Sequence, residues 1–91
     1  MFKTITPQKI QHKLGYIVQS GGRFSLQYLD GDLIAEIKVD RAEVTGLFPN
    51  SMTIVKGGVS KIPNDKERNL ILSRIINALG FWGMKYEIYH E

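Results

Sequence analysis

Two alternating runs of apolar residues, one on each side of Asp30-Gly31, constrain the fold of this chain more than any other feature. In the first run, Phe24, Leu26 and Tyr28 occupy every second position. In the second run, the apolar residues at every second position are Leu33, Ala35, Ile37 and Val39. Alternation with period two places one set of side chains on a single face of a β-strand, and Asp-Gly is a frequent hairpin turn. The two runs therefore predict adjacent antiparallel strands.

A third alternating run precedes these two and extends the predicted sheet. Its residues at every second position are Ile10, His12, Leu14, Tyr16 and Val18. Ile17 interrupts the alternation. Ser20-Gly21-Gly22 then marks a turn, because glycine accepts the positive φ that hairpin turns require. Together the three runs predict a three-stranded antiparallel meander.

The middle of the chain predicts a turn followed by a shorter hairpin. Leu47–Ser51 is interpreted as a turn, because its proline fixes φ and lacks a backbone N–H. Met52–Val55 is then a short strand, Lys56-Gly57-Gly58 a turn, and Val59–Ile62 the partner strand.

The following segment predicts an amphipathic helix with a defined start and end. Asn64, followed three residues later by Glu67, has the spacing of a capping box, in which two free backbone N–H groups gain acceptors. At about 100° per residue, one arc of the helix carries the apolar residues Ile71, Leu72, Ile75, Ile76, Ala78, Leu79 and Trp82. The opposite side carries Lys66, Ser73, Arg74 and Asn77. Gly83 is the predicted left-handed cap at the C-terminal end.

A terminal strand completes an α+β fold class. Met84, Tyr86 and Ile88 alternate with more polar residues after the helix. We expect an antiparallel β-meander at about residues 8–62, one long amphipathic helix at about 64–82 against a face of the sheet, and a C-terminal strand at about 84–89. The length of 91 residues suits a single domain over residues 1–91 with one small core.

Composition excludes several classes of protein. The chain contains no Cys, which excludes disulfide frameworks, thiolate catalysis and zinc sites with Cys ligands. The first residues lack the apolar segment of a signal peptide, and no apolar run approaches the roughly 18–20 residues of a membrane-spanning helix. We therefore expect a cytoplasmic protein without a membrane segment.

Motifs for catalysis or cofactor binding are weak. The two histidines, His12 and His90, could cleave RNA together with a nearby lysine only if the fold brings both imidazoles together. Asp30-Gly31-Asp32 lacks the further ligands of a calcium loop and is interpreted as a turn. The glycine pairs match no nucleotide-binding motif. We expect no enzyme activity, no catalytic residues, no metal and no cofactor.

Charge is distributed unevenly along the chain, whose formal net charge is +3. Residues 1–27 contain basic residues and no acid. Residues 28–50 are mostly acidic, and their carboxylates belong to Asp30, Asp32, Glu36, Asp40 and Glu43. The two zones could pair across adjacent strands, the basic zone could follow a phosphate backbone, or the acidic zone could bind a basic partner. Composition does not choose between these interpretations.

The second half of the chain resembles a small family of bacterial immunity proteins. The resemblance lies in Ser51–Ile54, Ile62–Arg68, Ile71–Leu79 and Gly83–Ile88. These segments look like the seventy-fourth numbered immunity family of polymorphic-toxin systems, whose members end in a helix, a glycine and a short strand. The resemblance implies a cytoplasmic protein without catalysis. Such a protein binds and neutralises a cognate toxin domain, commonly a nuclease delivered by a neighbouring bacterium.

The resemblance makes the acidic zone the candidate contact surface, since carboxylates can mimic nucleic acid in front of a cationic nuclease. The expected contact residues are Asp30, Asp32, Glu36, Asp40 and Glu43, with Tyr28 as an aromatic anchor. The alternative is a small basic protein that binds single-stranded nucleic acid, with bases stacked on Tyr16. Its phosphate-binding residues would be Lys9, Lys13 and Arg23. The sequence does not indicate an oligomeric state.

Overall fold

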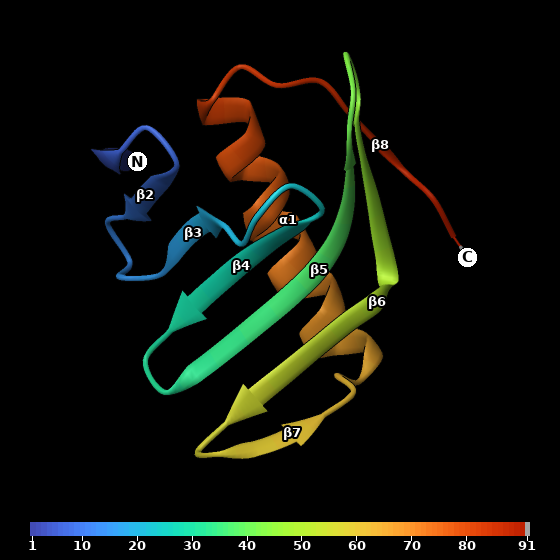
Figure 1. Ribbon diagram of the computed structural model, residues 1–91. Helices are drawn as coiled ribbons and strands as arrows, with labels where there is room; N and C mark the ends of the chain where they lie inside the picture. Colours follow the sequence, from blue (N-terminus) through green and yellow to red (C-terminus); the bar gives the residue numbers. More distant parts are fainter. Residues whose placement is uncertain (91) are drawn as a thin grey trace.

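One sheet contains all the strands of residues 1–90, and one helix lies against it. A computed structural model describes residues 1–90. The elements are β1 (Phe2–Thr6), β2 (Lys9–His12), β3 (Ile17–Ser20), β4 (Ser25–Asp30), β5 (Leu33–Arg41), β6 (Thr45–Lys56), β7 (Val59–Lys61), α1 (Asp65–Phe81) and β8 (Tyr86–Ile88). Strands β1 to β7 lie side by side in chain order, each antiparallel to the next, whereas β8 runs parallel to β6 (Figure 1). The predicted α+β class is confirmed.

The predicted hairpin at Asp30-Gly31 joins β4 to β5. Asp30 lies opposite Leu33, so the two turn residues are Gly31 and Asp32, and Gly31 has a φ of 60°. Glycine in this position gives the turn a twist that matches that of the strands. The positions of the two apolar runs that face the core are Leu26, Tyr28, Ala35, Ile37 and Val39. Phe24 is an exception: it precedes β4, where the chain has left the pleat, and it is 59% exposed.

The earliest alternating run forms two strands rather than one, which corrects the predicted three-stranded meander. β2 ends at His12, the chain turns at Gly15 with a φ of 105°, and β3 begins at Ile17. Ile10 lies opposite Val18. The sequence numbers of paired residues in this hairpin differ by an even number. The alternation of apolar and polar positions therefore continues across the turn, and the sequence pattern does not show where the chain reverses. The edge strand β1 has no counterpart in the predicted meander.

The predicted turn at Leu47–Ser51 is a bulge inside one long strand, β6. Between the pairs formed by Glu36 and Lys38, a single residue of β5 faces four residues of β6. The Lys38 N–H donates to Ser51 Oγ (2.8 Å), which in turn donates to the Phe48 carbonyl oxygen (2.6 Å). A bulge accommodates the proline, whose missing N–H would interrupt a regular ladder. The chain therefore bends here without reversing.

The helix α1 begins and ends where the sequence predicts. The Glu67 N–H donates to Asn64 Oδ1 (2.8 Å), and the Asn64 N–H donates to Glu67 Oε1 (3.2 Å), which completes the capping box. Gly83 follows the C-cap residue Trp82 with a φ of 73°. The buried helical residues are Ile71, Ile75, Ala78 and Leu79. The core lies between this arc and the face of the sheet in front of α1 (Figure 1).

The predicted short hairpin and terminal strand are also present. β6 and β7 join through Lys56-Gly57-Gly58, in which both glycines have positive φ. β8 lies within the predicted residues 84–89 but is parallel to its neighbour. The Thr45 N–H donates to the Lys85 carbonyl oxygen (2.9 Å), and the Tyr89 N–H donates to the Leu47 carbonyl oxygen (2.8 Å). β8 thus pairs with the beginning of β6, and β7 pairs with its end.

Candidate functional site

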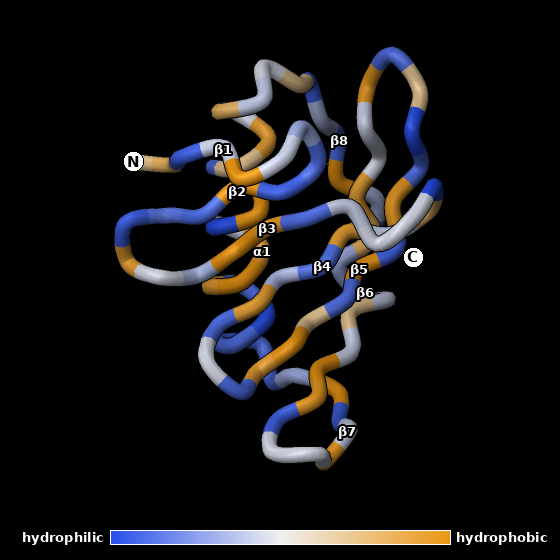
Figure 2. Tube along the Cα trace, turned by 60° about the vertical axis from the view of Figure 1, so that its left-hand side comes forward, coloured by the Kyte–Doolittle hydropathy of each residue, from blue (hydrophilic) through white to orange (hydrophobic). Residues whose placement is uncertain are grey.

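The face of the sheet opposite α1, called here the open face, carries a row of apolar side chains. Ile17 lies opposite Leu29. Leu29 lies opposite Ile34, which in turn lies opposite Val55, so this apolar row crosses strands β3 to β6. Ile34 is 45% exposed and Val55 37%. Ala35 and Ile54, which adjoin these two residues on their strands, point toward α1 and are buried, and hydrophobic residues recur along β3, β4 and β5 in Figure 2.

The four residues of the apolar row were not among the predicted site residues, although the sequence carries a signal for them. Ile17 interrupts the alternation of its run, and Ile34 occupies a position where the alternation calls for a polar residue. A single apolar residue at a position where the alternation predicts a polar one is weak evidence for a binding site, because single exposed apolar side chains are common. Only the register between strands shows that four of them are adjacent.

A polar row runs beside the apolar row. Gln19 lies opposite Gln27, and Gln27 lies opposite Glu36. The Gln19 Nε2 donates to Gln27 Oε1 (2.7 Å), and the Gln27 Nε2 donates to Glu36 Oε2 (3.3 Å). Thr53 continues this row on β6. Because the amides are oriented by hydrogen bonds between strands, the open face combines an apolar strip with an ordered polar margin.

Beyond the polar row, the open face carries an aromatic pair. The rings of Phe48 and Tyr89 stack with centroids 5.2 Å apart, and Lys38 Nζ lies 5.1 Å from the Phe48 centroid. Gly46 makes room for this arrangement, because a Cβ atom at that residue would lie 2.5 Å from Cε2 of Tyr89. The segment after β8 therefore forms part of the open face.

The predicted acidic contact residues do not form one patch. Glu36 and Asp40 lie on the open face of β5, with Lys38 between them. Asp32 lies in the β4–β5 turn, and Glu43 lies in the β5–β6 turn. The nine residues of β5 separate these turns, which corresponds to about 30 Å for an extended strand. Of the five carboxylates, Glu36 and Asp40 are the ones that share the open face.

Tyr28 and Asp30 face α1, which corrects the prediction that Tyr28 anchors a partner. Tyr28 is 2% exposed, because the even-numbered residues of β4 face the core. Arg74 Nη1 donates to the Tyr28 hydroxyl (2.6 Å) and forms an ion pair with Asp30 Oδ2 (3.3 Å). The Tyr28 hydroxyl donates to the same carboxylate oxygen (3.0 Å). Burial raises the pKa of Tyr28, so the phenol stays protonated within this cluster.

Burial of Tyr16 likewise corrects the predicted stacking platform for nucleic acid. Tyr16 is 2% exposed, and its ring stacks on His12 with centroids 4.7 Å apart. The guanidinium carbon of Arg74 lies 4.6 Å from the Tyr16 centroid. A ring enclosed in this way offers no face to a base. Arg74, predicted on the polar side of the helix, instead lies at the border of the apolar arc and reaches toward the sheet.

The fold does not bring the two histidines together. His12 ends β2 and His90 follows β8, with strands β3 to β6 between them. At the usual spacing of neighbouring strands, the five intervals from β2 to β8 correspond to about 24 Å. Among residues 1–90, no three His, Asp or Glu side chains are grouped so that they could hold a metal ion. The paired imidazoles of an acid–base nuclease are therefore not assembled in the described part of the chain.

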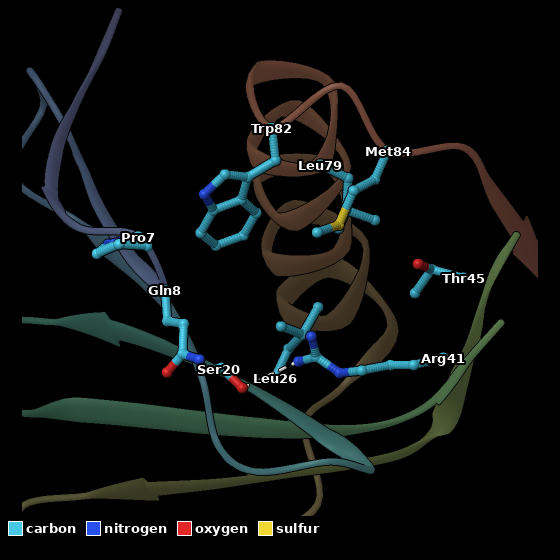
Figure 3. A pocket seen from close by; sticks show the side chains of 9 residues that line it. All are labelled: Pro7, Gln8, Ser20, Leu26, Arg41, Thr45, Leu79, Trp82 and Met84. Atoms are coloured by element: carbon cyan, nitrogen blue, oxygen red, sulfur yellow. Dashed lines mark hydrogen bonds between the residues drawn. The ribbon is translucent and has the colours of Figure 1, made fainter. Parts of the chain in front are cut away.

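A small cavity lies between the β1–β2 turn, the end of β5 and the C-terminal end of α1 (Figure 3). Its volume of about 50 Å³ is far below the roughly 300–1,000 Å³ of ligand pockets. Arg41 Nη2 crosses it to donate to Ser20 Oγ (3.1 Å) and to the Ser25 carbonyl oxygen (3.3 Å). This arginine is thus occupied in holding the β3–β4 turn, and the cavity has no room for a substrate.

Comparisons with known proteins assign no family. No protein-family model, no curated protein and no solved structure matches the chain. The helix of residues 1–90, α1, is too short and too polar to cross a membrane. The open face, with its apolar row, is the feature from which we infer a function.

Proposed function

We propose that this protein is an immunity protein without catalytic activity, which neutralises a cognate bacterial toxin domain in the cytoplasm by binding it through the open face. The observation that carries the proposal is the apolar row on the side of the sheet without a helix. Its members are Ile17, Leu29, Ile34 and Val55, one from each of four neighbouring strands. Exposed apolar patches with polar margins are typical of protein-binding surfaces.

The charges near the apolar row favour a basic partner. Glu36 borders the row on β5, and Asp40 lies further along the same strand. Glu87 of β8 lies opposite Gly46 and adds a third carboxylate to this side of the sheet. A cationic nuclease domain would present basic groups to these carboxylates, which accelerates association. The resemblance of the sequence to immunity proteins supports a toxin domain as this partner.

The proposal predicts that Ile34→Lys abolishes neutralisation. A lysine at the centre of the apolar row would have to lose its hydration on docking, and we expect the affinity to fall by about ten-fold or more. The toxin domain for the test is the one encoded by the gene immediately upstream. The measurements are survival of cells that express this domain, and retention of a 1:1 complex during gel filtration.

Leu70→Lys is the matched control, because Leu70 is 51% exposed on α1 and lies away from the open face. It should leave both survival and the complex unchanged, and the thermal midpoints of the two variants should agree. If Ile34→Lys protects cells as well as the unchanged protein does, the toxin does not dock on the open face. If the unchanged chain forms no complex, the toxin domain is not its partner.

A further inference from the structure

We propose that, in the absence of a toxin, the open face is covered by a second copy of this chain. The two copies are related by a two-fold axis parallel to the strands, between β4 and β5. An interface of this kind requires a surface that is complementary to itself. The inference concerns the same face as the proposed function, but it rests on strand register alone and does not require that a toxin binds.

The apolar row matches itself under this rotation. Rotation about this axis places β4 of one copy opposite β5 of the other, and β3 of one copy opposite β6 of the other. Leu29 therefore faces Ile34 of the second copy, because the two residues share one register position. Ile17 faces Val55 of the second copy for the same reason. Four side chains from each copy then form one continuous apolar layer, which removes their exposed surface from water.

The polar row also matches itself. Gln27 faces Glu36 of the second copy, so an amide donor meets a carboxylate acceptor. Gln19 faces Thr53 of the second copy, and both of these groups are neutral. Neither pairing opposes like charges. The row that borders the apolar strip therefore favours the same axis as the strip itself.

A two-fold axis perpendicular to the strands, along the apolar row, is the competing arrangement. This rotation also brings the apolar row of one copy onto the apolar row of the other. Each strand, however, then runs opposite in direction to the same strand of the second copy. Glu36, two residues to one side of Ile34, would then lie over the β4–β5 turn of the second copy, which carries Asp32. Carboxylates would be opposed at two symmetric places, and like charges across an interface repel. The axis parallel to the strands avoids this contact.

The open face is large enough for a stable interface. The molecule measures 33 × 31 × 22 Å, and the sheet lies along its broad side with α1 behind it (Figure 1). A typical specific interface takes about 800 Å² from each partner. Sheets that pack face to face lie about 10 Å apart, with their strands within about 30°. The proposed axis gives such an aligned pair of sheets, with one helix on each outer side.

Cysteine cross-linking tests this axis, because the chain contains no Cys. Ile17→Cys and Val55→Cys are made as separate proteins and treated with a short bis-maleimide, each alone and both mixed. Neither protein can form a link within one chain. The proposed axis places residue 17 against residue 55 of the other copy. We therefore expect covalent dimers in the mixture at about ten-fold or more the yield of either protein alone.

Two further samples complete the test. A mixture of Val59→Cys with Leu70→Cys is the matched control, since these side chains are 65% and 51% exposed and lie off the open face. It should give no more covalent dimer than its components do. Sedimentation at micromolar concentration should show a dimer for the unchanged protein and a monomer for Ile34→Lys, whose lysines would enter the apolar layer.

Two results would overturn the proposal. One is cross-linking of Ile17→Cys alone at the level of the mixture, which indicates the perpendicular axis. The other is a monomeric unchanged protein with no cross-link in the mixture. Because these samples contain no toxin, their outcome is separate from that of the proposed function. If Ile34→Lys is monomeric and still protects cells, the dimer is supported and the docking of the toxin on this face is refuted.

Discussion

At the residue scale, Arg74 connects α1 to the sheet. Its Nη1 atom donates to the Tyr28 hydroxyl and lies 3.3 Å from Asp30 Oδ2, while its guanidinium covers the Tyr16 ring. The hydrogen bond with Tyr28 raises the pKa of Arg74, so the side chain stays charged. The cluster also gives partners to a phenol hydroxyl at the margin of the core, and an unpaired polar group there would cost about 1–3 kcal/mol.

Tyr28→Phe should lower the free energy of unfolding by about 1–2 kcal/mol, because Arg74 and Asp30 lose the hydroxyl that bridges them. The ring itself is kept, so core packing should change little. Tyr86→Phe is the control, since Tyr86 is 42% exposed on β8, and it should change the same quantity by less than about 0.5 kcal/mol. Urea denaturation measures both. Equal losses in the two variants would contradict the bridging role of Tyr28.

At the scale of the element, α1 depends on its N-terminal cap. Glu67 accepts from the Asn64 N–H, and this hydrogen bond lowers the pKa of Glu67, with a smaller contribution from Lys61, whose Nζ lies 3.5 Å from Glu67 Oε2. A carboxylate with a lowered pKa in the folded state stabilises that state above its ordinary pKa. This stabilisation is lost as the pH falls through the folded-state value.

Glu67→Gln should therefore weaken the acid dependence of stability. Glutamine can still accept the capping hydrogen bond but does not titrate. Below about pH 4.3, the ordinary pKa of glutamate, the urea midpoint of the unchanged protein should fall more steeply than that of the variant. The control is Glu43→Gln in the exposed β5–β6 turn, which should follow the unchanged protein. Parallel curves for the unchanged protein and Glu67→Gln would refute the cap as the origin of the effect.

At the scale of the whole molecule, the two edges of the sheet are built differently. β1 alone forms one edge, whereas β7 and β8 share the other by pairing with different parts of β6. β8 lies opposite Thr45–Leu47, and Leu47 is fully buried. A short parallel strand thus covers an edge that would otherwise present free backbone groups, which are prone to pair with other chains.

Ending the chain at Gly83 should lower the free energy of unfolding on the order of 3 kcal/mol, since several backbone hydrogen bonds and some apolar burial are lost. Hydrogen exchange locates the effect. The Thr45 amide should lose protection because its acceptor is the Lys85 carbonyl oxygen, whereas the Lys38 amide, which donates to Ser51 Oγ, should keep most of its protection. Unchanged protection of Thr45 would show that β8 contributes little.

Features that depend on neighbouring residues were predicted correctly. The hairpin at Gly31, the glycine turn between β6 and β7, and the capping box of Asn64 and Glu67 each require a few adjacent residues in a given order. The β2–β3 hairpin was missed because its turn preserves the alternation. The bulge in β6 was mistaken for a turn, since a proline interrupts a ladder in both structures.

The sequence by itself determined the α+β class, the ends of the helix and the phase of the alternating runs, because these follow from local backbone preferences and from periodicity. The tertiary structure alone decided which residues share a surface. Strand register and the position of α1 bury Tyr28, separate Asp32 from Glu43 and align Ile34 with its neighbours on the open face. Periodicity specifies which side of its own strand a residue occupies. Its neighbours across the sheet depend on turns and bulges many residues away.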